Sequence, residues 1–371
     1  MRIAVISPDY PDSKRAVFPF VKQLVDQWAL LGEEVYVIAP YSVTHNKGLS
    51  CGHSTYTVGN NEVHVIRPNC FSVSNIKIGG SSLSDLLIKR AINRGLKSLT
   101  FKPDIIYGHF WFSAFCGYDY AKRNNIPLFV ATGESVIDFR KNEKTKDFCS
   151  YINGAICVSS KNMRESVELE LISEDNCIVL PNGIDKALFK TYDSSSLRAS
   201  LGVTKDNFTV VFVGWFINRK GSKRLSEAIT LLNDNKIKSI FIGEGSEEPD
   251  CPGIVFKGVL PHNLIPRYLC CGDVFVLPTL NEGCCNSIVE AMACGLPIVS
   301  SDLPFNKDIC NDGNSILIDP MNVESIKDAI IKLRDDSNYR KLLSNGALKT
   351  AENLSIAKRA ERILDFLNSR I

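Results

Sequence analysis

The chain has 371 residues, a length that fits two domains of ordinary size better than one core. With 44% hydrophobic and 23% charged residues, its composition is that of a globular protein. A formal net charge of +2 lacks the basic excess that nucleic-acid binding requires, so no nucleic-acid partner is expected. No charge-free apolar run approaches the roughly 20 residues that span a bilayer, and the start of the chain reads as a strand instead of a signal peptide, which favours a cytoplasmic protein.

The cysteines give no sign of a metal site. There are 13 of them, an odd number. Neither Cys270-Cys271 nor Cys284-Cys285 forms the paired C-x-x-C arrangement of a zinc site, so no metal is expected. In a reducing compartment such residues behave mostly as small buried hydrophobes.

The first half of the chain alternates strands and helices. Arg2 to Ser7 predicts a buried strand, Val21 to Leu31 repeats apolar residues at helical spacing, and Val35 to Ala39 predicts a second strand. A strand–helix–strand unit of this kind makes a parallel sheet. Because no G-x-G-x-x-G follows the first strand, the fingerprint of a dinucleotide cofactor is absent. Further strands are predicted at residues 63–67, 104–107, 127–131, 155–158 and 177–180.

A basic segment between residues 77 and 102 carries six Lys and Arg residues against one acid, Asp85. Apolar residues recur between the charges at helical spacing, which predicts an amphipathic helix. Such a helix usually turns its basic face to solvent. Alternatively, it would contact an anionic membrane surface or a lipid-linked substrate, and the protein would then be peripheral on the inner face of the cell membrane.

A polar stretch from Thr191 to Ser200 predicts a linker, and a second series of strands and helices follows it. Two α/β domains in tandem are therefore expected, at 1–188 and 189–354, with ligands bound in a cleft between them. The predicted strands of the second half are 208–213, 238–242, 254–257, 273–277 and 298–300, and its predicted helices are 222–232, 262–271, 323–333, 339–352 and 355–367.

The densest pattern runs from Leu280 to Ser301 and reads LNEGCCNSIVEAMACGLPIVSS. It follows an apolar run that predicts a buried strand. Ser287 and Glu290 match the S-x-x-E capping box that begins a helix, and Gly295 would end that helix. Parallel sheets bind ligands at the loops that follow their strands, and a helix N-terminus placed there favours an anion such as phosphate.

Two interpretations of the glutamates in this stretch stay open. Glu290 would only cap a helix and Glu282 would be a solvated loop acid, or both would belong to a ligand site. The loop from Gly214 to Gly221, GWFINRKG, favours the ligand site. A glycine after a strand lets a ligand approach the backbone, and Arg219 with Lys220 can neutralise a diphosphate.

With these motifs in order, the chain resembles the family 4 retaining glycosyltransferases of the GT-B fold, of the bacterial polysaccharide type. The resemblance covers nearly the whole chain. It implies an α/β fold of two Rossmann-like domains facing each other across a cleft, the first on the acceptor side and the second binding a nucleotide-sugar, with a final helix at 355–371 packed back onto the first. The motifs that carry it are PNGID at 181–185, VGWFINRKG at 213–221, IGEG at 242–245, FKGVLP at 256–261 and DVFVLPTLNEGCCNSIVEAMACGLPIVSS at 273–301.

The resemblance also implies roles on the donor side. Glu282 matches a glutamate beside the hydroxyls of the transferred sugar, Glu290 a glutamate that binds the ribose, and Lys220 a lysine on the diphosphate. Lys257 would lie by the base. The remaining donor-side residues, in the loop after the first strand of this half and around the helix start, are Gly214, Gly283, Cys284, Cys285, Asn286 and Ser287.

Fixed cations and helix amides would take the place of a metal ion on the leaving diphosphate, and the sequence holds no D-x-D motif. No cofactor is therefore expected. In this family the leaving phosphate helps to deprotonate the acceptor, so no protein nucleophile is required.

The chain departs from the family pattern at three places. Trp215 stands where the family usually has an arginine, and Arg219 would supply the missing cation. Arg15-Ala16-Val17 occupies the place of a glycine-rich turn.

The third departure concerns a histidine that many members place after the strand at 127–131. Here Gly133 takes its position. Glu134 or His109 would then face the reaction centre, although a lone histidine in a G-H-F-W run is more often a packed core residue.

The sequence thus predicts an enzyme of the hexosyltransferase type. The donor would be a UDP-sugar first and a GDP-sugar next, and the acceptor a glycan or lipid-linked glycan in surface polysaccharide synthesis. A nucleotide-sugar isomerase or epimerase of the same fold, and a non-catalytic nucleotide-sugar-binding subunit, are the alternatives.

Overall fold

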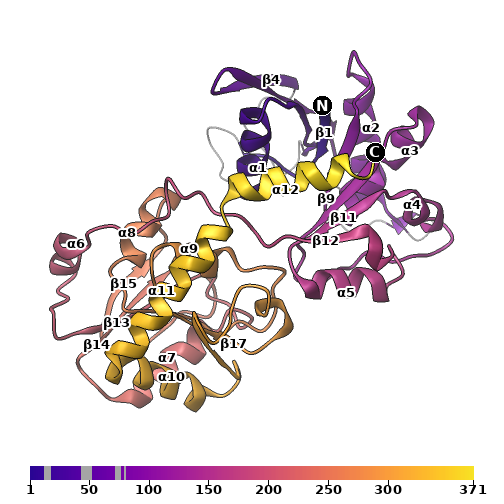
Figure 1. Cartoon of the computed structure of the whole chain (residues 1–371). Helices are drawn as coiled ribbons and strands as arrows, with labels where there is room; N and C mark the ends of the chain where they lie inside the picture. Colours follow the sequence, from indigo (N-terminus) through magenta and orange to yellow (C-terminus); the bar gives the residue numbers. More distant parts are fainter. Residues whose placement is uncertain (12–17, 43–51, 72–76, 79–80) are drawn as a thin grey trace. The chain divides into compact units, whose positions relative to one another are not determined.

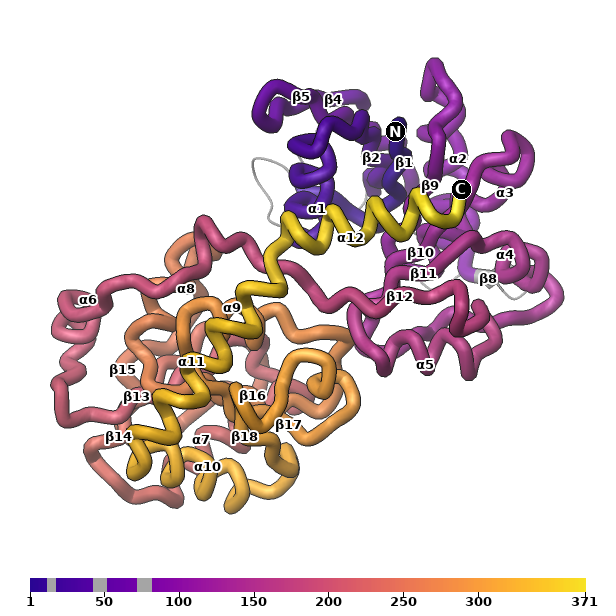
Figure 2. The backbone as a smooth tube through the Cα atoms, viewed as in Figure 1, coloured from indigo at the N-terminus to yellow at the C-terminus, as the bar shows by residue number. Residues whose placement is uncertain are grey.

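The computed structural model describes residues 1–11, 18–42, 52–71, 77–78 and 81–371, and the chain forms two compact units (Figure 1). Unit 1 comprises Met1–Leu180 and Ala357–Ile371, and unit 2 comprises Pro181–Ile356. The chain passes from β12 into unit 2 and returns from α11 into α12 (Figure 2). Each unit has a main sheet that is largely or wholly parallel, with helices, as the alternating sequence pattern predicts.

The main sheet of unit 1 has eight strands in the order β12-β11-β10-β9-β1-β2-β5-β4. Every neighbouring pair is parallel except β4 with β5, which form an antiparallel hairpin. Residues 3–6 of the central strand β1 are buried on both faces, which explains their unbroken apolar sequence. The strands are β1 (Arg2–Ile6), β2 (Glu34–Ile38), β4 (Gly52–Val58), β5 (Asn61–Arg67), β9 (Ile105–His109), β10 (Leu128–Thr132), β11 (Gly154–Cys157) and β12 (Cys177–Val179); two short pairs are β3 (Tyr41–Ser42) with β6 (Asn69–Cys70) and β7 (Lys77–Ile78) with β8 (Ser81–Ser82).

The last helix of the chain belongs to unit 1, where its first turns pass next to α1 (Figure 1). Trp28 of α1 donates its indole N–H to the carbonyl of Ala360, 3.2 Å away. Arg359 is buried and donates to the carbonyl of Leu180 at 2.8 Å. The helices of unit 1 are α1 (Pro19–Leu30), α2 (Leu83–Lys97), α3 (Trp111–Asn124), α4 (Lys146–Tyr151), α5 (Ser160–Glu168) and α12 (Ile356–Asn368), with a 3₁₀ turn at Glu174–Asn176.

Unit 2 has a six-stranded sheet in the order β15-β14-β13-β16-β17-β18, and all neighbouring strands are parallel. Its strands are β13 (Phe208–Val213), β14 (Ile237–Ile242), β15 (Ile254–Gly258), β16 (Val274–Leu277), β17 (Ile298–Ser301) and β18 (Ser315–Ile318). Its helices are α6 (Ser195–Ser200), α7 (Ser222–Leu232), α8 (Ile265–Leu269), α9 (Asn286–Ala293), α10 (Val323–Asp335) and α11 (Ser337–Asn353), with 3₁₀ turns η2 (His262–Leu264) and η3 (Pro304–Asn306).

Three details differ from the sequence-based expectation. The polar stretch from Thr191 to Ser200 lies inside unit 2, because Arg198 within it donates to the carbonyl of Cys271 at 2.6 Å. The units instead divide at Leu180, not at residue 188. The helix expected at 262–271 is split into η2 and α8, with Pro266 in the first turn of α8.

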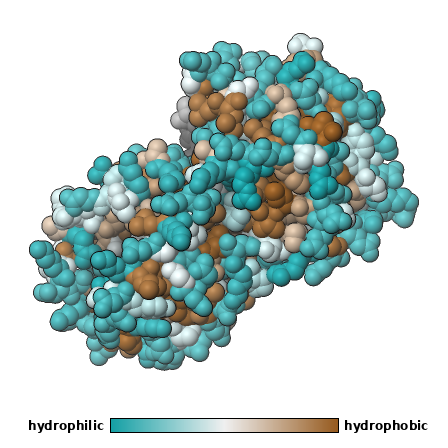
Figure 3. Space-filling view, in the orientation of Figure 1, coloured by the Kyte–Doolittle hydropathy of each residue, from teal (hydrophilic) through white to brown (hydrophobic). Residues whose placement is uncertain are grey.

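On the face that Figure 3 shows, hydrophilic side chains predominate and hydrophobic ones form scattered groups. Within the described residues, no helix is long and apolar enough to cross a membrane.

Candidate functional site

Two loops of unit 2 meet where the sheet reverses its direction of winding. The chain continues from β13 to β14 on one side of the sheet and from β16 to β17 on the other, although β13 and β16 are neighbours. The loops 214–221 and 278–285 therefore both leave the carboxyl edge of the sheet at this point. Open α/β sheets bind their ligands at such a switch point.

The two loops are fixed to each other by hydrogen bonds. The N–H of Leu280 donates to the carbonyl of Arg219 at 2.8 Å, and the Arg224 guanidinium donates to the carbonyl of Pro278 at 2.9 Å. Gly221 has φ +80°, and a β-carbon on it would lie 2.6 Å from the Pro278 oxygen. Only glycine fits this close approach, so the position of the preceding Lys220 depends on it.

Glu282 is the centre of the polar contacts between these loops. Its Oε1 accepts hydrogen bonds from Lys220 Nζ at 2.6 Å, Arg219 Nη1 at 2.7 Å and Thr279 Oγ1 at 2.9 Å. The side chains of Glu282 and Lys220 are only 12% and 11% exposed, whereas that of Arg219 is 37% exposed. Two cations thus share one carboxylate oxygen, which leaves positive charge for a further anion.

Lys220 keeps its charge despite its burial. Desolvation opposes the charged form, but the neighbouring Cys285 and Glu282 outweigh it and raise the pKa of Lys220 above the usual lysine value. A protonated, nearly buried ammonium group at a helix start is suited to binding a phosphate.

The expected capping box at Ser287 is wrong. The N-cap of helix α9 is Cys285, two residues before Ser287, so the helix begins at Asn286, and among the described residues no side chain caps it. Ser287 instead lies in the first turn, 3.3 Å from the sulfur of Cys285. Because the helix starts early, Glu290 is too far along it to cap the N-terminus, and its carboxylate is directed to another partner.

That partner is His262, which the sequence interpretation missed. Its Nε2 lies 3.3 Å from Glu290 Oε1, and its ring packs edge-on against Phe189 at 5.2 Å. The hydrogen bond with Glu290 raises the pKa of His262; burial opposes the shift, and the charges of Glu290 and Asp185 add to it. The only sequence signal was a histidine directly after the FKGVLP motif.

Asn182 is a second residue of this region without a role in the sequence interpretation. Its Nδ2 donates to Asn286 Oδ1 at 2.7 Å and to the carbonyl of Cys284 at 3.2 Å. The asparagine of the PNGID motif therefore fixes the loop that joins Glu282 to helix α9.

The other donor-side predictions fall into two groups. Gly214, Gly283, Cys284 and Cys285 lie in the two loops of the switch point, and Cys285 is buried. Lys257 lies apart, on the exposed side of β15, where its Nζ pairs with Glu248 at 2.8 Å. Trp215 is the second residue of the loop 214–221, and its side chain is 59% exposed, so it does not take the place of an arginine in the Glu282 cluster.

In unit 1, His109 is a packed residue at the end of β9. It is 8% exposed, with its ring 5.3 Å from that of Phe20 and 4.7 Å from that of Phe110. Burial, and then the charge of Arg359, lower the pKa of His109 to about 3. The imidazole is therefore neutral at physiological pH.

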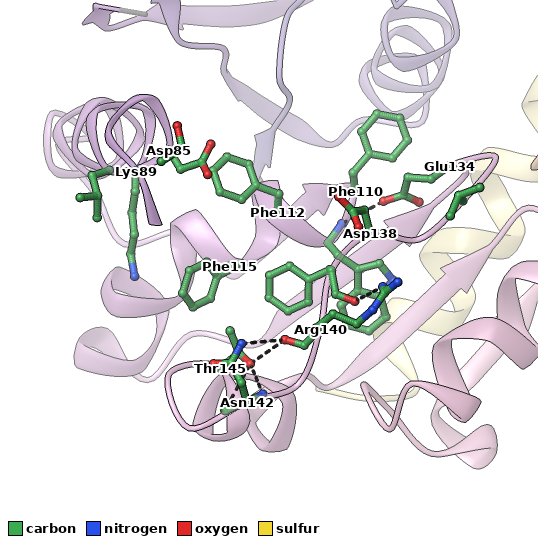
Figure 4. A pocket seen from close by; sticks show the side chains of 15 residues that line it. Asp85, Lys89, Phe110, Phe112, Phe115, Glu134, Asp138, Arg140, Asn142 and Thr145 are labelled. Atoms are coloured by element: carbon green, nitrogen blue, oxygen red, sulfur yellow. Dashed lines mark hydrogen bonds between the residues drawn. The ribbon is translucent and has the colours of Figure 1, made fainter. Parts of the chain in front are cut away.

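Glu134 follows β10 and is half-buried. Its Oε2 accepts the N–H of Gly133 at 2.8 Å, and its Oε1 accepts the N–H of Trp111 at 3.3 Å. Burial raises the pKa of Glu134 against the opposing effect of these hydrogen bonds. It lines a cavity of about 680 Å³ in unit 1 (Figure 4).

The basic segment contains helix α2, whose apolar residues are used inside unit 1. Ile92 and Leu96 are buried in the core beside α3. Lys89 pairs with Asp119 at 3.0 Å. Arg90 and Lys97 are exposed. The departure at Arg15-Ala16-Val17 lies outside the described residues.

The described residues contain no cluster of three or more His, Cys, Asp or Glu side chains that could hold a metal ion. The charged contacts of the switch point join Lys220 and Arg219 to Glu282.

Comparison with protein families gives two matches that follow each other along the chain. Residues 19–188 match a family described as Glycosyltransferase Family 4, and residues 207–336 match one described as Glycosyl transferases group 1. The second match contains both loops of the switch point.

Curated relatives are similar at low identity. A putative teichuronic acid biosynthesis glycosyltransferase, TuaC of Bacillus subtilis, is 24% identical over 273 residues, which cover 71% of this chain and 70% of the relative. A UDP-Gal:alpha-D-GlcNAc-diphosphoundecaprenol alpha-1,3-galactosyltransferase of Escherichia coli is 26% identical over 229 residues. The match covers 57% of this chain and 58% of the relative.

Solved structures share the fold over their whole length. Sucrose-phosphate synthase of Thermosynechococcus elongatus has a TM-score of 0.78 at 16% identity. The match covers 99% of this chain and 98% of the synthase chain. Anabaena HepE in complex with UDP-glucose has a TM-score of 0.72 at 16% identity, with complete coverage of both chains.

Proposed function

Because the chain belongs to the family 4 glycosyltransferases and has the GT-B fold, we propose that it transfers a sugar from a nucleoside-diphosphate donor to a glycan or lipid-linked glycan. A UDP-sugar is the first candidate donor and a GDP-sugar the second. The names of relatives in polysaccharide synthesis and of a neighbour in complex with UDP-glucose support this choice. The product would be a surface polysaccharide.

One observation carries the proposal, namely the two cations that share Oε1 of Glu282. In the bound state, Lys220 and Arg219 would turn toward the diphosphate and stabilise the negative charge that develops as it leaves. Glu282 would then accept hydrogen bonds from hydroxyls of the transferred sugar. The open N-terminus of α9 adds backbone N–H groups that favour the same anion.

Glu290 is the proposed ribose ligand. Its carboxylate lies one helical turn after the start of α9, and its contact with His262 is polar and half-exposed, so ribose hydroxyls can replace it. Asn182 would hold the intervening loop in the geometry that both glutamates require.

We further propose transfer with retention and without a metal ion. The diphosphate would be neutralised by Lys220 and Arg219, and its leaving oxygen would take the proton of the acceptor hydroxyl. Full activity after exhaustive chelation and an unchanged anomeric configuration in the product, read by NMR, are the expected results. Loss of activity that Mg²⁺ or Mn²⁺ restores would refute the metal-free mechanism.

The experiment that tests the donor site is a thermal-shift screen of the full chain against UDP- and GDP-sugars. A ligand that binds only the folded state raises the melting temperature by mass action. Glu290→Ala should abolish the shift, while Glu227→Ala, an exposed acid on α7, should leave it unchanged. A shift that survives Glu290→Ala would refute the assignment of this site.

Contact with an anionic membrane is proposed for the exposed cations of α2. Arg90→Gln with Lys97→Gln should reduce flotation with anionic vesicles, because each cation near such a surface contributes about 1 kcal/mol. The matched control is Lys236→Gln with Lys238→Gln in unit 2. Equal flotation of both double variants would refute a contact through α2.

A further inference from the structure

Helices α8 and α9 of unit 2 end on two cysteines that contact each other. Cys270 is the C-cap residue of α8, and Cys294 is the C-cap residue of α9. The Cys270 sulfur lies 4.0 Å from the carbonyl oxygen of Cys294, and the Cys294 sulfur lies 3.9 Å from the carbonyl oxygen of Pro266, in the first turn of α8. The thiol of Cys294 also forms a hydrogen bond with the sulfur of Cys270. The two sulfurs are therefore neighbours, although they belong to different helices.

The two cysteines differ in their access to solvent. Cys270 is half-buried, whereas Cys294 is only 5% exposed. A small reagent in solution therefore reaches Cys270 first. In a pair of this kind the accessible sulfur is oxidised first, and its neighbour then displaces the oxygen.

The hydrogen bonds around Cys270 favour its thiolate. The S–H of Cys294 lowers the pKa of Cys270 to about 7; burial opposes this shift, and the N–H of Tyr192, 3.3 Å from the sulfur, adds to it. The same contact between the two sulfurs, followed by burial, raises the pKa of Cys294. Because the thiolate is the nucleophilic form of cysteine, Cys270 is reactive near neutral pH while Cys294 keeps its proton.

We propose that Cys270 and Cys294 form a reversible thiol-oxidation site whose oxidant is a peroxide. The Cys270 sulfur attacks one oxygen of hydrogen peroxide, the O–O bond breaks and hydroxide leaves, so the sulfur is oxidised to a sulfenic acid and the peroxide is reduced. The Cys294 sulfur then attacks the Cys270 sulfur. A disulfide bond forms, the S–O bond breaks, and the leaving hydroxide takes the Cys294 proton to become water. A small dithiol reverses the reaction by exchange and is itself oxidised to a disulfide.

The disulfide acts on the contact between His262 and Glu290. His262 lies in η2, which leads directly into α8. Glu290 lies one turn before Cys294, whose N–H donates to the Glu290 carbonyl at 3.1 Å. The two contacts thus join the same two segments, and a covalent bond between Cys270 and Cys294 restricts the movement of η2 relative to α9. Since ribose hydroxyls have to replace His262 at Glu290, the oxidised chain binds the donor more weakly, a consequence that rests on the proposed function.

Disulfide mapping of the folded full chain tests the site. The chain is treated briefly with hydrogen peroxide, its remaining thiols are alkylated, and it is digested without reductant. Mass spectrometry should find two peptides joined through Cys270 and Cys294, which dithiothreitol separates. Cys270→Ser and Cys294→Ala should both lose this joined pair. Cys251→Ser is the matched control, because it removes another half-buried cysteine, and it should retain the pair.

The order of oxidation is read with dimedone, which reacts with sulfenic acids. In Cys294→Ala it should label Cys270, because the thiol that displaces the oxygen is missing. In Cys270→Ser, peroxide should leave Cys294 as a thiol. If Cys294→Ala unfolds, the wild type treated with peroxide and dimedone together replaces it, with the label expected on Cys270. No joined pair in the wild type, or a sulfenic acid on Cys294 in Cys270→Ser, would overturn the assignment of the site.

Calorimetric titration of the nucleotide sugar separates failure of this inference from failure of the proposed function. The oxidised wild type should bind the donor about fivefold more weakly than the reduced protein, the scale of one hydrogen bond, and dithiothreitol should restore the affinity. Cys270→Ser should bind the donor equally before and after peroxide. Equal affinity of the reduced and the fully joined wild type, or the same loss in Cys270→Ser, would overturn the link to the donor site. If the reduced wild type binds no donor, the proposed function fails, while the joined peptides still decide whether the oxidation site exists.

Discussion

Lys220 Nζ and Glu282 Oε1 lie 2.6 Å apart, and both side chains are almost removed from solvent. They come from loops that follow different strands, β13 and β16, which are neighbours in the sheet. The ion pair therefore joins the two loops of the switch point and keeps a charged lysine where a diphosphate would bind. Its loss should affect both folding and donor binding.

Lys220→Met should lower the free energy of unfolding by about 2 kcal/mol. Removing one partner of a buried pair leaves the other uncompensated, although Arg219 and Thr279 still contact Glu282 and reduce the cost. Urea denaturation measures the change. Lys223→Met is the matched control, because this exposed lysine lies 3.7 Å from Glu247 and should contribute little. Equal effects of the two variants would contradict the importance of the buried pair.

Arg219→Gln should lower kcat/KM for transfer about 100-fold, the effect of removing one group that stabilises developing negative charge. Trp215→Ala should change it little, because Trp215 lies exposed outside the Glu282 cluster. Steady-state kinetics with a saturating acceptor measures both. The reverse order of effects would show that Arg219 does not supply the cation missing at position 215.

Binding of a nucleotide sugar should strengthen as the pH rises. The pKa of His262 is raised above 6.5 by Glu290, so the charged pair persists toward neutral pH and competes with the ribose. The His262–Glu290 pair stabilises the fold fully when the pH is below the pKa of His262 in the unfolded chain. This stabilisation is lost as the pH rises through the higher pKa of His262 in the folded chain, and Glu290 is then free to bind the ribose.

Titration calorimetry between about pH 6 and about pH 8.5 measures this dependence, since a histidine loses its charge near this range. His262→Gln should bind the donor with little dependence on pH. A pH slope that remains in this variant would assign the effect to another group.

His109 should have the opposite influence on stability. The pKa of His109 is depressed to about 3 in the folded chain. Its contribution to the free energy of unfolding is therefore complete above its pKa of 6.5 in the unfolded chain, and is lost as the pH falls toward 3. His109→Gln should therefore lose less stability than the wild type between about pH 7 and about pH 5, measured by urea denaturation. The control is His53→Gln, on the exposed strand β4. An equal loss in all three proteins would contradict a neutral, buried His109.

Much of the fold could be predicted because buried parallel strands have unbroken apolar sequences. The strand Phe208–Val213 is an example, with all six residues buried. Strand β4 was missed because Gly52–Val58 is largely polar and exposed, and its pairing with β5 is set by the hairpin. Pairing of this kind depends on tertiary contacts, which a local pattern does not contain.

The candidate site was predictable where its residues follow strand ends. Glu282 and Lys220 were identified in this way, and the sheet order brings their loops together. His262 was missed because it lies 28 residues from Glu290 in the sequence and meets it only in the folded chain. Lys257 was placed by motif alone, and the alternation of β15 turns it outward to Glu248.

The proposed donor site is tested most directly by calorimetric titration of UDP- and GDP-sugars into the full chain, the variants Lys220→Met and Glu290→Gln, and the control Glu227→Gln. One of these donors should bind the wild type and the control at a single site with equal affinity. Both site variants should bind it at least about tenfold more weakly, since each loses a hydrogen bond to or from a charged group. Equal affinity in all four proteins, or no binding of any donor to the wild type, would contradict a nucleotide-sugar site at Lys220, Glu282 and Glu290.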